Sequence, residues 1–431
     1  MKNTFDGKLA LLGGQPAIKK EFKKYNPIGA EEVSAGLEVL KSGMLSNFVG
    51  AWDPDFYGGP QVQKFERHLE KYFNVNHAIT FNSWTSGLIA AVGAIGIEPG
   101  DEVIVCPWTM SASAIAILHW NAIPIFADID PDTFCIDPES VRRNISNKTK
   151  AIMAVDIAGQ SAPIDDLLKI CVEFDIKLIS DTAQAPGAHY KEKYAGTLAH
   201  IGGFSLNFHK HIHTGEGGIA VTEDDELAEK MRLIRNHAEV VVAGKNQKDL
   251  VNMIGYNFRL GEIEAAIGIE QIQKLKEKVD SRIRIASLLY EGLINLRGLT
   301  LPKIRSECTH VYYVFSMKID QNVTNVSRDK IAEALRSEGV PALANRYQNL
   351  HLLPMFQKKV AYGKSGFPWT ADFTRKDIDY GKGICPVAEY LQDKAFMGLG
   401  MCDFDLTEED VGLIVIAFQK VWENLEKISD L

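Results

Sequence analysis

Two residues stand out for the chemistry that their surroundings would allow, Lys210 and Asp181. Lys210 lies between the apolar run that ends at Phe204-Ser205 and the turn sequence Thr-Gly-Glu-Gly-Gly at 214–218. Asp181 follows closely on the mostly apolar run 176–179, so we expect it at the carboxyl end of a strand. Pyridoxal phosphate (PLP) needs a lysine amine for a Schiff base and a carboxylate that keeps its pyridine nitrogen protonated. The pair therefore predicts a PLP site.

The elements that would position these residues follow from the hydrophobic pattern. Up to about residue 280, apolar strand-like runs alternate with amphipathic helical patterns, which is typical of a mostly parallel α/β sheet. We expect helices at 85–95 and 112–118. Expected strands are 78–81, 103–105, 123–126, 151–155, 178–179, 203–205 and 218–222.

Beyond about residue 280 the pattern changes. A long charged helix is followed by an expected strand at 311–317 and by helices at 328–338 and 408–427, which indicates a smaller α+β domain. The polar, glycine-containing segment 357–384 is expected to form a loop or lid. We therefore predict a large domain over residues 1–280, with an N-terminal arm over about 1–25, and a small domain over residues 281–431.

Composition narrows the function classes. A chain of 431 residues with 46% hydrophobic residues can bury a large core, and its length favours two domains. The net charge of -9, without a basic block, argues against binding to nucleic acid or to an anionic membrane surface. A small-molecule substrate is the better expectation.

The cysteines and the first residues of the sequence indicate the cellular compartment in which the protein is expected. The six cysteines are scattered without a Cys-x-x-Cys pair, which disfavours a disulfide framework and a structural zinc site. No apolar core follows Lys2, and no window approaches the ~20 apolar residues that a membrane helix needs. We therefore expect a soluble, unprocessed, cytoplasmic protein with no membrane segment.

With these motifs, the sequence resembles the DegT/StrS family of PLP-dependent sugar aminotransferases, which have the aspartate aminotransferase fold type I. The resemblance runs from about residue 22 to the C-terminus, with its motifs in a consistent order. They are Gly58-Gly59-Pro60, the stretches 82–87, 100–105, 181–184 and 210–218, Gly255-Tyr256-Asn257-Phe258-Arg259 and the stretch 264–268. The resemblance implies a mostly parallel seven-stranded sheet sandwiched by helices, the PLP transferase fold type I, with a smaller C-terminal α+β domain.

The resemblance also implies roles at the PLP ring. Lys210 would form the Schiff base, Asp181 would face the pyridine nitrogen, and Gln184 would hydrogen-bond the 3-hydroxyl. Where the family commonly has an aromatic residue over the ring, this chain has Met110, whose sulfur can pack on a ring for roughly 0.3 to 1.5 kcal/mol. The residue that covers the ring is therefore left open.

The cofactor's phosphate needs backbone N–H groups and hydroxyls, which the turn 83–87 at the start of a helix would supply. Trp84 departs from the family, which usually has glycine there, and Thr85 and Ser205 are the expected hydroxyl ligands. Asn257 matches an asparagine that reaches the phosphate from the neighbouring subunit, which implies a homodimer with shared active sites. The alternative for this turn is an ordinary helix N-cap.

Candidate substrate residues are Asn207, His209, His211 and His351. Asn207 replaces a histidine that is often found in the family, and His351 matches a small-domain stretch near the active site, although a surface loop histidine is the alternative. The alternation of His209, His211 and His213 could also indicate a metal site. No cysteine or carboxylate completes such a set, so we expect no metal and one or two histidines at the substrate pocket.

The implied reaction is a transamination through a Lys210 aldimine and pyridoxamine phosphate. It would move an amino group from glutamate or glutamine to a keto-sugar, with a nucleotide-linked keto-sugar preferred. Family members with histidine in place of this lysine are sugar dehydratases, so Lys210 argues for transamination. The alternatives are an aminotransferase of a keto-cyclitol (inosose-like), an aminohydroxybenzoate-type synthase and, in another class, a non-catalytic PLP-fold regulatory or metal-binding protein.

Overall fold

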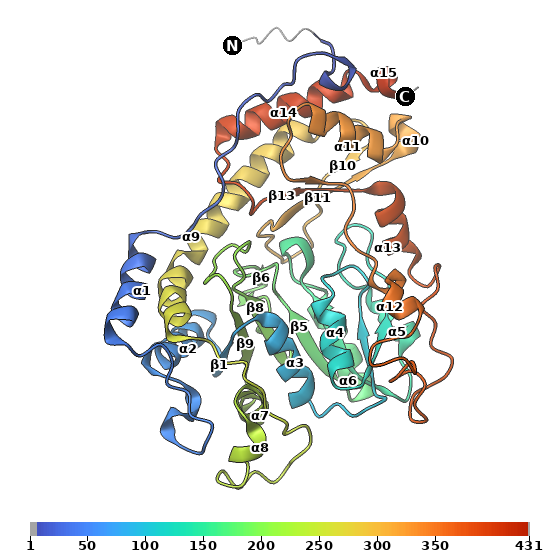
Figure 1. The fold of residues 1–431 in the computed structure, drawn as a ribbon. Coiled ribbons are helices and arrows are strands. Elements are labelled where there is room, and N and C mark those ends of the chain that lie inside the picture. The colour runs from blue at the N-terminus through green and yellow to red at the C-terminus, as the bar shows by residue number, and fades with distance from the viewer. Residues whose placement is uncertain (1–6, 430–431) are drawn as a thin grey trace.

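The computed structural model describes residues 7–429, and its central element is a seven-stranded sheet (Figure 1). The strand order is β1-β9-β8-β5-β4-β2-β3, and β9 alone runs antiparallel to its neighbours in this sheet. The strands are β1 (His77–Phe81), β2 (Glu102–Val105), β3 (Ile123–Phe126), β4 (Thr149–Val155), β5 (Lys177–Asp181), β8 (Ile201–Ser205) and β9 (Gly218–Thr222). All seven expected strands are present, and the predicted fold class is confirmed.

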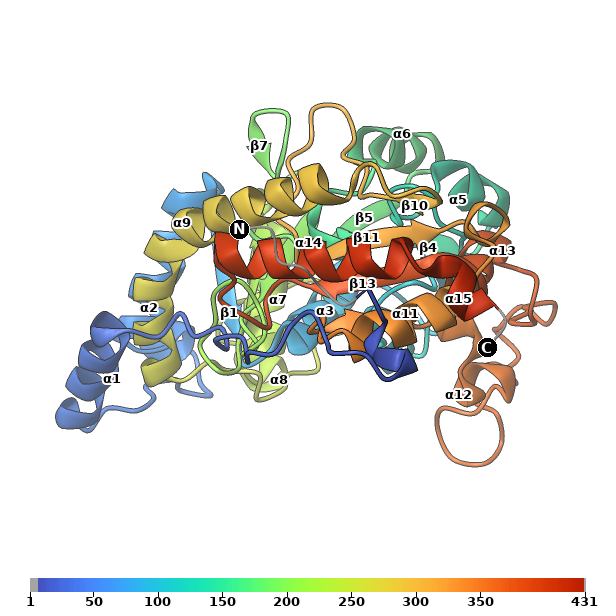
Figure 2. The same ribbon diagram turned by 90° about the horizontal axis from the view of Figure 1, so that it is seen from above.

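Helices cover both faces of this sheet, which explains why its strands are almost wholly apolar. Figure 2 shows α5 (Pro138–Asn144) and α6 (Ile164–Phe174) on one side of the sheet and α3 (Trp84–Ala94) and α7 (Asp225–Arg235) on the other. The large part of the chain also contains α2 (Pro60–Phe73), α4 (Ala112–His119) and α8 (Ala238–Val241). Every residue of β2 and β3 is buried.

A second sheet of four antiparallel strands forms the C-terminal part, in the order β10-β11-β13-β12. Its strands are β10 (Leu299–Thr300), β11 (Val314–Ile319), β12 (Leu343–Ala344) and β13 (Phe396–Gly400). The helices of this part are α10 (Gln321–Thr324), α11 (Arg328–Ser337), α12 (Pro354–Gln357), α13 (Pro386–Tyr390), α14 (Glu408–Trp422) and α15 (Leu425–Ser429). The expected closing helix at 408–427 is therefore two helices that break between residues 422 and 425.

The two sheets are joined by α9 (Glu262–Leu293), a helix of 32 residues. One end of α9 packs against α1 (Ala30–Ser42) and α2, and it also contacts α14 of the C-terminal part. The predicted domain boundary at residue 280 falls inside this helix and stays a prediction. Residues 1–6, on which the expectation of an unprocessed start rested, lie outside the described residues. No helix within residues 7–429 has both the length and the apolar character needed to cross a membrane.

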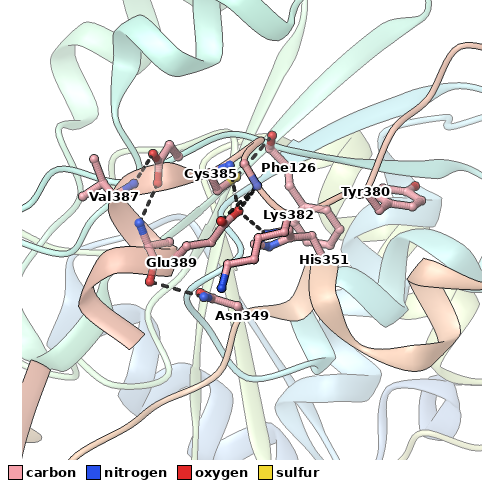
Figure 3. A network of polar contacts seen from close by, with 12 residues as sticks. Phe126, Asn349, His351, Tyr380, Lys382, Cys385, Val387 and Glu389 are labelled. Carbon is pink, nitrogen blue, oxygen red and sulfur yellow. Dashed lines mark hydrogen bonds and ion pairs between the residues drawn. The ribbon is translucent and has the colours of Figure 1, made fainter. Parts of the chain in front are cut away.

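The segment between α12 and α13 contains no helix or strand in the described structure and lies against the large sheet. The Tyr380 hydroxyl donates to the Pro124 carbonyl at 2.8 Å, and Arg375 Nε donates to Glu102 Oε1 at 2.8 Å. Figure 3 shows the polar network at its carboxyl end, where Glu389 accepts hydrogen bonds from the Gly383 N–H. The prediction of a loop is confirmed, and its function as a lid stays a prediction.

Candidate active site

A cavity of ≈ 180 Å³ lies at the carboxyl ends of β4, β5 and β8, beside the N-terminus of α3. This is the edge at which parallel α/β sheets bind ligands. Its lining residues are Ser83, Trp84, Thr85, Leu88, Thr109, Met110, Ala112, Val155, Asp181, Ala183, Gln184, Ser205, Asn207, His209, Lys210, Glu216 and Gly217. The structure thus brings most of the predicted site residues to one cavity.

Lys210 is a buried amine in this cavity, with 7% of its surface exposed. Its backbone N–H donates to the Asn207 carbonyl at 3.0 Å, which forms a turn directly after β8. Burial lowers the pKa of Lys210 to about 8, although the charge of Asp181 acts in the opposite direction. Nζ lies 4.4 Å from the centroid of the Tyr313 ring, which comes from the C-terminal part of the chain. A lysine with this pKa is partly unprotonated near neutral pH and can act as a nucleophile.

Asp181, the last residue of β5, is 5% exposed and accepts three hydrogen bonds. Trp84 Nε1 donates to Oδ1 at 2.8 Å, and the Ala183 N–H donates to the same oxygen at 3.2 Å. Ser113 Oγ donates to Oδ2 at 2.7 Å. The carboxylate is therefore fixed in the cavity wall by donors from three segments of the chain.

Gln184 is held by both ends of its amide. Its Oε1 accepts from the Ala158 N–H at 2.9 Å, and its Nε2 donates to the Tyr347 hydroxyl at 3.0 Å. Burial raises the pKa of Tyr347 to about 12, so the phenol stays protonated at neutral pH. The Tyr347 ring also stacks on Trp108, with 5.6 Å between the ring centroids. Within residues 7–429, the other N–H of the Gln184 amide makes no hydrogen bond, which leaves it for a ligand.

The N-terminus of α3 forms a further part of the cavity wall. Ser83 is the N-cap, since its Oγ accepts from the Ser86 N–H at 3.1 Å. This cap leaves Thr85 and the other N–H groups of the first turn available, and phosphate binding by the turn stays a prediction. Thr85 lies in the first turn, where backbone N–H groups have no partner within the helix. A Cβ on Gly218 would overlap the backbone of Ser83 and Trp84, so glycine lets β9 approach this turn closely.

The cavity has the polar groups that PLP would need. It presents a buried amine, a buried carboxylate, the hydroxyls of Thr85 and Ser205, and a helix N-terminus that suits a phosphate. Asn207 Oδ1 is buried without a hydrogen-bond partner within the described structure, while its Nδ2 donates to Glu216 Oε1 at 2.8 Å. These groups fit the cofactor.

Met110 and His209 also line the cavity. Met110 is 64% exposed, which places it at the mouth, where a side chain can cover a bound ring. The pKa of His209 falls to about 4 because of burial and, secondarily, the charge of Lys210, so this imidazole is neutral at pH 7.

Three predicted site residues do not line this cavity. His211 is fully buried, and its Nε2 lies 2.8 Å from the Val311 carbonyl. Asn257 Oδ1 accepts from Arg259 Nε at 2.7 Å. His351 is fully buried beside Glu389, with 3.0 Å between Nε2 and Oε1 (Figure 3), so the alternative of a surface histidine is wrong. The roles proposed for these three residues stay predictions.

The alternating histidines contact different groups. His213 Nδ1 accepts from the Gly215 N–H at 3.2 Å, whereas His211 bonds a carbonyl and His209 faces the cavity. Within residues 7–429, no group of three histidine, cysteine or acidic residues is placed to hold a metal ion.

Sequence reasoning missed three residues that contact the side chains lining the cavity, Ser113, Tyr313 and Tyr347. Ser113 is a polar residue in the largely apolar helix α4, which is a weak signal. Tyr313 contacts Lys210, and Tyr347 accepts from Gln184. Both tyrosines come from segments more than one hundred residues further along the chain, and their local sequence gave no sign of these contacts.

Comparison with known proteins agrees with this geometry. A sequence model of the DegT/DnrJ/EryC1/StrS aminotransferase family matches residues 51–380. The chain is 32% identical to L-glutamine:2-deoxy-scyllo-inosose aminotransferase of Streptomyces lividus, over 96% of this chain and 97% of that protein. It is also 32% identical to GDP-perosamine synthase of Caulobacter vibrioides, over 74% of this chain and 88% of that protein. Among solved structures, an aminotransferase from Psychrobacter cryohalolentis superposes with a TM-score of 0.80 at 26% identity and covers 94% of this chain and 100% of its own.

Proposed function

Since the chain belongs to the DegT/DnrJ/EryC1/StrS aminotransferase family, we propose that this aminotransferase uses PLP to move an amino group from glutamate or glutamine to a keto-sugar. The observation that carries the proposal is one cavity lined by the buried amine of Lys210, the carboxylate of Asp181 and the amide of Gln184. Family membership and the catalytic groups disfavour a non-catalytic or metal-binding protein.

PLP, when bound, supplies an electron sink for the carbanion that forms at the donor's α-carbon. The Asp181 carboxylate would keep the pyridine nitrogen protonated, and Gln184 would orient the ring through its remaining N–H. Thr85, Ser205 and the N-terminus of α3 would bind the phosphate, and Met110 would cover the ring from the cavity mouth.

Lys210 would act both as the nucleophile that anchors the cofactor and as the base of the proton transfer. With a pKa of about 8, Nζ would take a proton from the donor's α-carbon near neutral pH and would deliver it to C4′ of the cofactor. The neutral imidazole of His209 and the amide of Asn207 would contact the substrate, a role supported by their place in the lining of the same cavity.

The preferred acceptor is a nucleotide-linked keto-sugar. The similarity to GDP-perosamine synthase supports this class. A keto-cyclitol is the second candidate, because the similarity to the inosose aminotransferase extends over 96% of this chain, well beyond the residues that the family model matches. That relative's name also favours glutamine as the donor.

We further propose a homodimer with shared sites. Asn257 does not line the cavity of its own chain, which agrees with a role in the partner's cavity. Helix α1 exposes the apolar side chains of Val33, Leu37 and Leu40, which a partner would cover. All six cysteines are free, as expected of the reducing cytoplasm in which we place the enzyme.

The test is the visible absorbance of the purified protein and of Lys210→Ala, before and after glutamate or glutamine is added. We expect an absorbing adduct in the wild type only. After borohydride reduction, mass spectrometry should place PLP on the peptide that contains Lys210. The proposal would be contradicted by a wild-type protein that binds no PLP, or by one whose absorbance spectrum stays unchanged when glutamate or glutamine is added. A GDP-linked keto-sugar and 2-deoxy-scyllo-inosose, offered to the donor-treated enzyme, then separate the two acceptor classes.

A further inference from the structure

Trp84, at the N-terminus of α3, is a buried side chain in the wall of the cavity. Trp84 is 3% exposed, and its indole N–H donates to Asp181 Oδ1 at 2.8 Å. The bond joins the first residue of α3 to the last residue of β5. A hydrogen bond to a charged acceptor is stronger than one between neutral groups, so the contact is energetically significant.

The surrounding backbone leaves room for the indole. A Cβ on Gly87 would lie 2.5 Å from Trp84 Cε3, and a Cβ on Gly203 would overlap both the indole and the Ile219 carbonyl. Neither glycine has a positive φ, so the need for glycine there is one of space. Helix α3 and strand β8 thus each supply a glycine to the slot that holds Trp84.

The slot fixes the orientation of the Asp181 carboxylate. Oδ1 faces the indole donor, and Oδ2 accepts from Ser113 Oγ at 2.7 Å. With a donor on each oxygen, the carboxylate cannot rotate freely about its χ2 bond. A site that holds a charged group in its working orientation before the ligand arrives needs little reorganisation on binding.

We propose that Trp84 is a positioning residue, which acts through Asp181 to hold the carboxylate toward the pyridine nitrogen of PLP. The inference rests on the proposed function, since it assumes that PLP occupies the cavity. It assigns to Trp84 a role beyond the backbone contact with phosphate that its place in the turn suggested.

The first experiment needs no cofactor. In ¹⁵N-indole-labelled, PLP-free protein, the Trp84 Nε1–H signal, assigned with Trp84→Phe, should shift and exchange faster with solvent in Asp181→Ala. The Trp120 signal is the control, because Trp120 is also buried, donates to the Ile89 carbonyl at 2.8 Å and packs against the α3 glycine Gly93. A Trp84 signal that Asp181→Ala leaves unchanged would overturn the inference, whether or not the protein binds PLP.

The second experiment measures PLP binding. Trp84→Phe keeps an aromatic ring but removes the donor, and it should raise the PLP dissociation constant about tenfold, the size expected for a lost hydrogen bond to a charged group. It should also shift the pH at which the visible band of bound PLP changes, and Trp120→Phe should do neither.

The same substitution in an Asp181→Ala background separates positioning from packing. If Trp84 acts through Asp181, Trp84→Phe adds little to the loss that Asp181→Ala causes. Equal losses in both backgrounds would show that the ring only fills space, and the inference would fail while the proposed function stands. If the wild type binds no PLP, the proposed function fails. The Trp84 Nε1–H signal would then still show whether Trp84 donates to Asp181.

Discussion

Lys210 combines deep burial with the absence of an ion-pair partner in the described structure, and this sets its acid–base behaviour. Burial disfavours the ammonium form more than the charge of Asp181 favours it, so the pKa falls to about 8. The unfolded chain keeps an ordinary lysine pKa of about 10.4. Between these values the unfolded state binds the proton and the folded state does not. The contribution of Lys210 to the free energy of unfolding therefore rises with pH across this window.

We expect the amine of Lys210 in PLP-free protein to react with trinitrobenzenesulfonate with a midpoint near pH 8, because only the unprotonated amine is a nucleophile. Exposed lysines should react with midpoints near their ordinary value of about 10.4. Peptide mass spectrometry after short labelling at each pH gives both profiles in one sample. A Lys210 profile that coincides with that of the exposed lysines would show that burial does not depress its pKa.

At the scale of elements, buried carboxylates anchor the segment that follows α12. Asp128 Oδ2 accepts from the Val387 N–H at 2.8 Å, and its Oδ1 accepts from the Ala388 N–H at 3.0 Å, so Asp128 caps the start of α13 from a distant part of the chain. Glu389, in α13, accepts from the Cys385 N–H and pairs with His351. The position of residues 358–385 therefore depends on these bonds.

Asp128→Ala should lower the free energy of unfolding by about 1–3 kcal/mol, because it leaves two N–H groups of α13 without acceptors. Urea unfolding followed by circular dichroism measures this loss. Limited proteolysis should then cut within residues 358–385 faster than in the wild type. Asp224→Ala is the matched control, since Asp224 caps α7 through the Glu226 and Leu227 N–H groups. Its loss should not speed cleavage of 358–385, and equal cleavage in both variants would refute the anchoring role.

At the scale of the whole molecule, a single chain does not bring every residue that is predicted to bind the cofactor to its own cavity, since Asn257 does not line it. The outer face of α1 exposes Val33 (64%), Leu37 (46%) and Leu40 (56%), while its inner face packs on α9. Three exposed apolar residues at i, i+4 and i+7 form one stripe of a helix, which is typical of an interaction surface.

The double substitution Leu37→Glu and Leu40→Glu should dissociate the homodimer proposed above into monomers, because it places two charges in the proposed interface. The monomer should also retain PLP poorly, since Asn257 would no longer reach the partner's cavity. Sedimentation velocity gives the mass, and absorbance of the gel-filtered protein gives the bound PLP. Val172→Glu, at an apolar residue of α6 that is 85% exposed, is the control and should leave the dimer intact. A double variant that still sediments as a dimer would place the interface elsewhere.

Local sequence was sufficient for the strands of the large sheet and for the order of its motifs. Buried strands are short apolar runs, and turn residues mark where they end, so the positions of Asp181 and Lys210 could be predicted without knowing what they contact. The family resemblance added the identity of the fold. Boundaries in the smaller part were less well predicted, as at β11, which begins at Val314 and not at residue 311.

Tertiary structure alone decided which side chains meet. The indole of Trp84 and the hydroxyl of Ser113 reach Asp181 because α3, α4 and β5 pack together, and no local pattern encodes that meeting. Packing also turned His211 into the interior, although its alternation with His209 suggested a shared face. Periodicity gives the direction of a side chain only where the backbone is regular, and residues 206–217 form an irregular loop between β8 and β9.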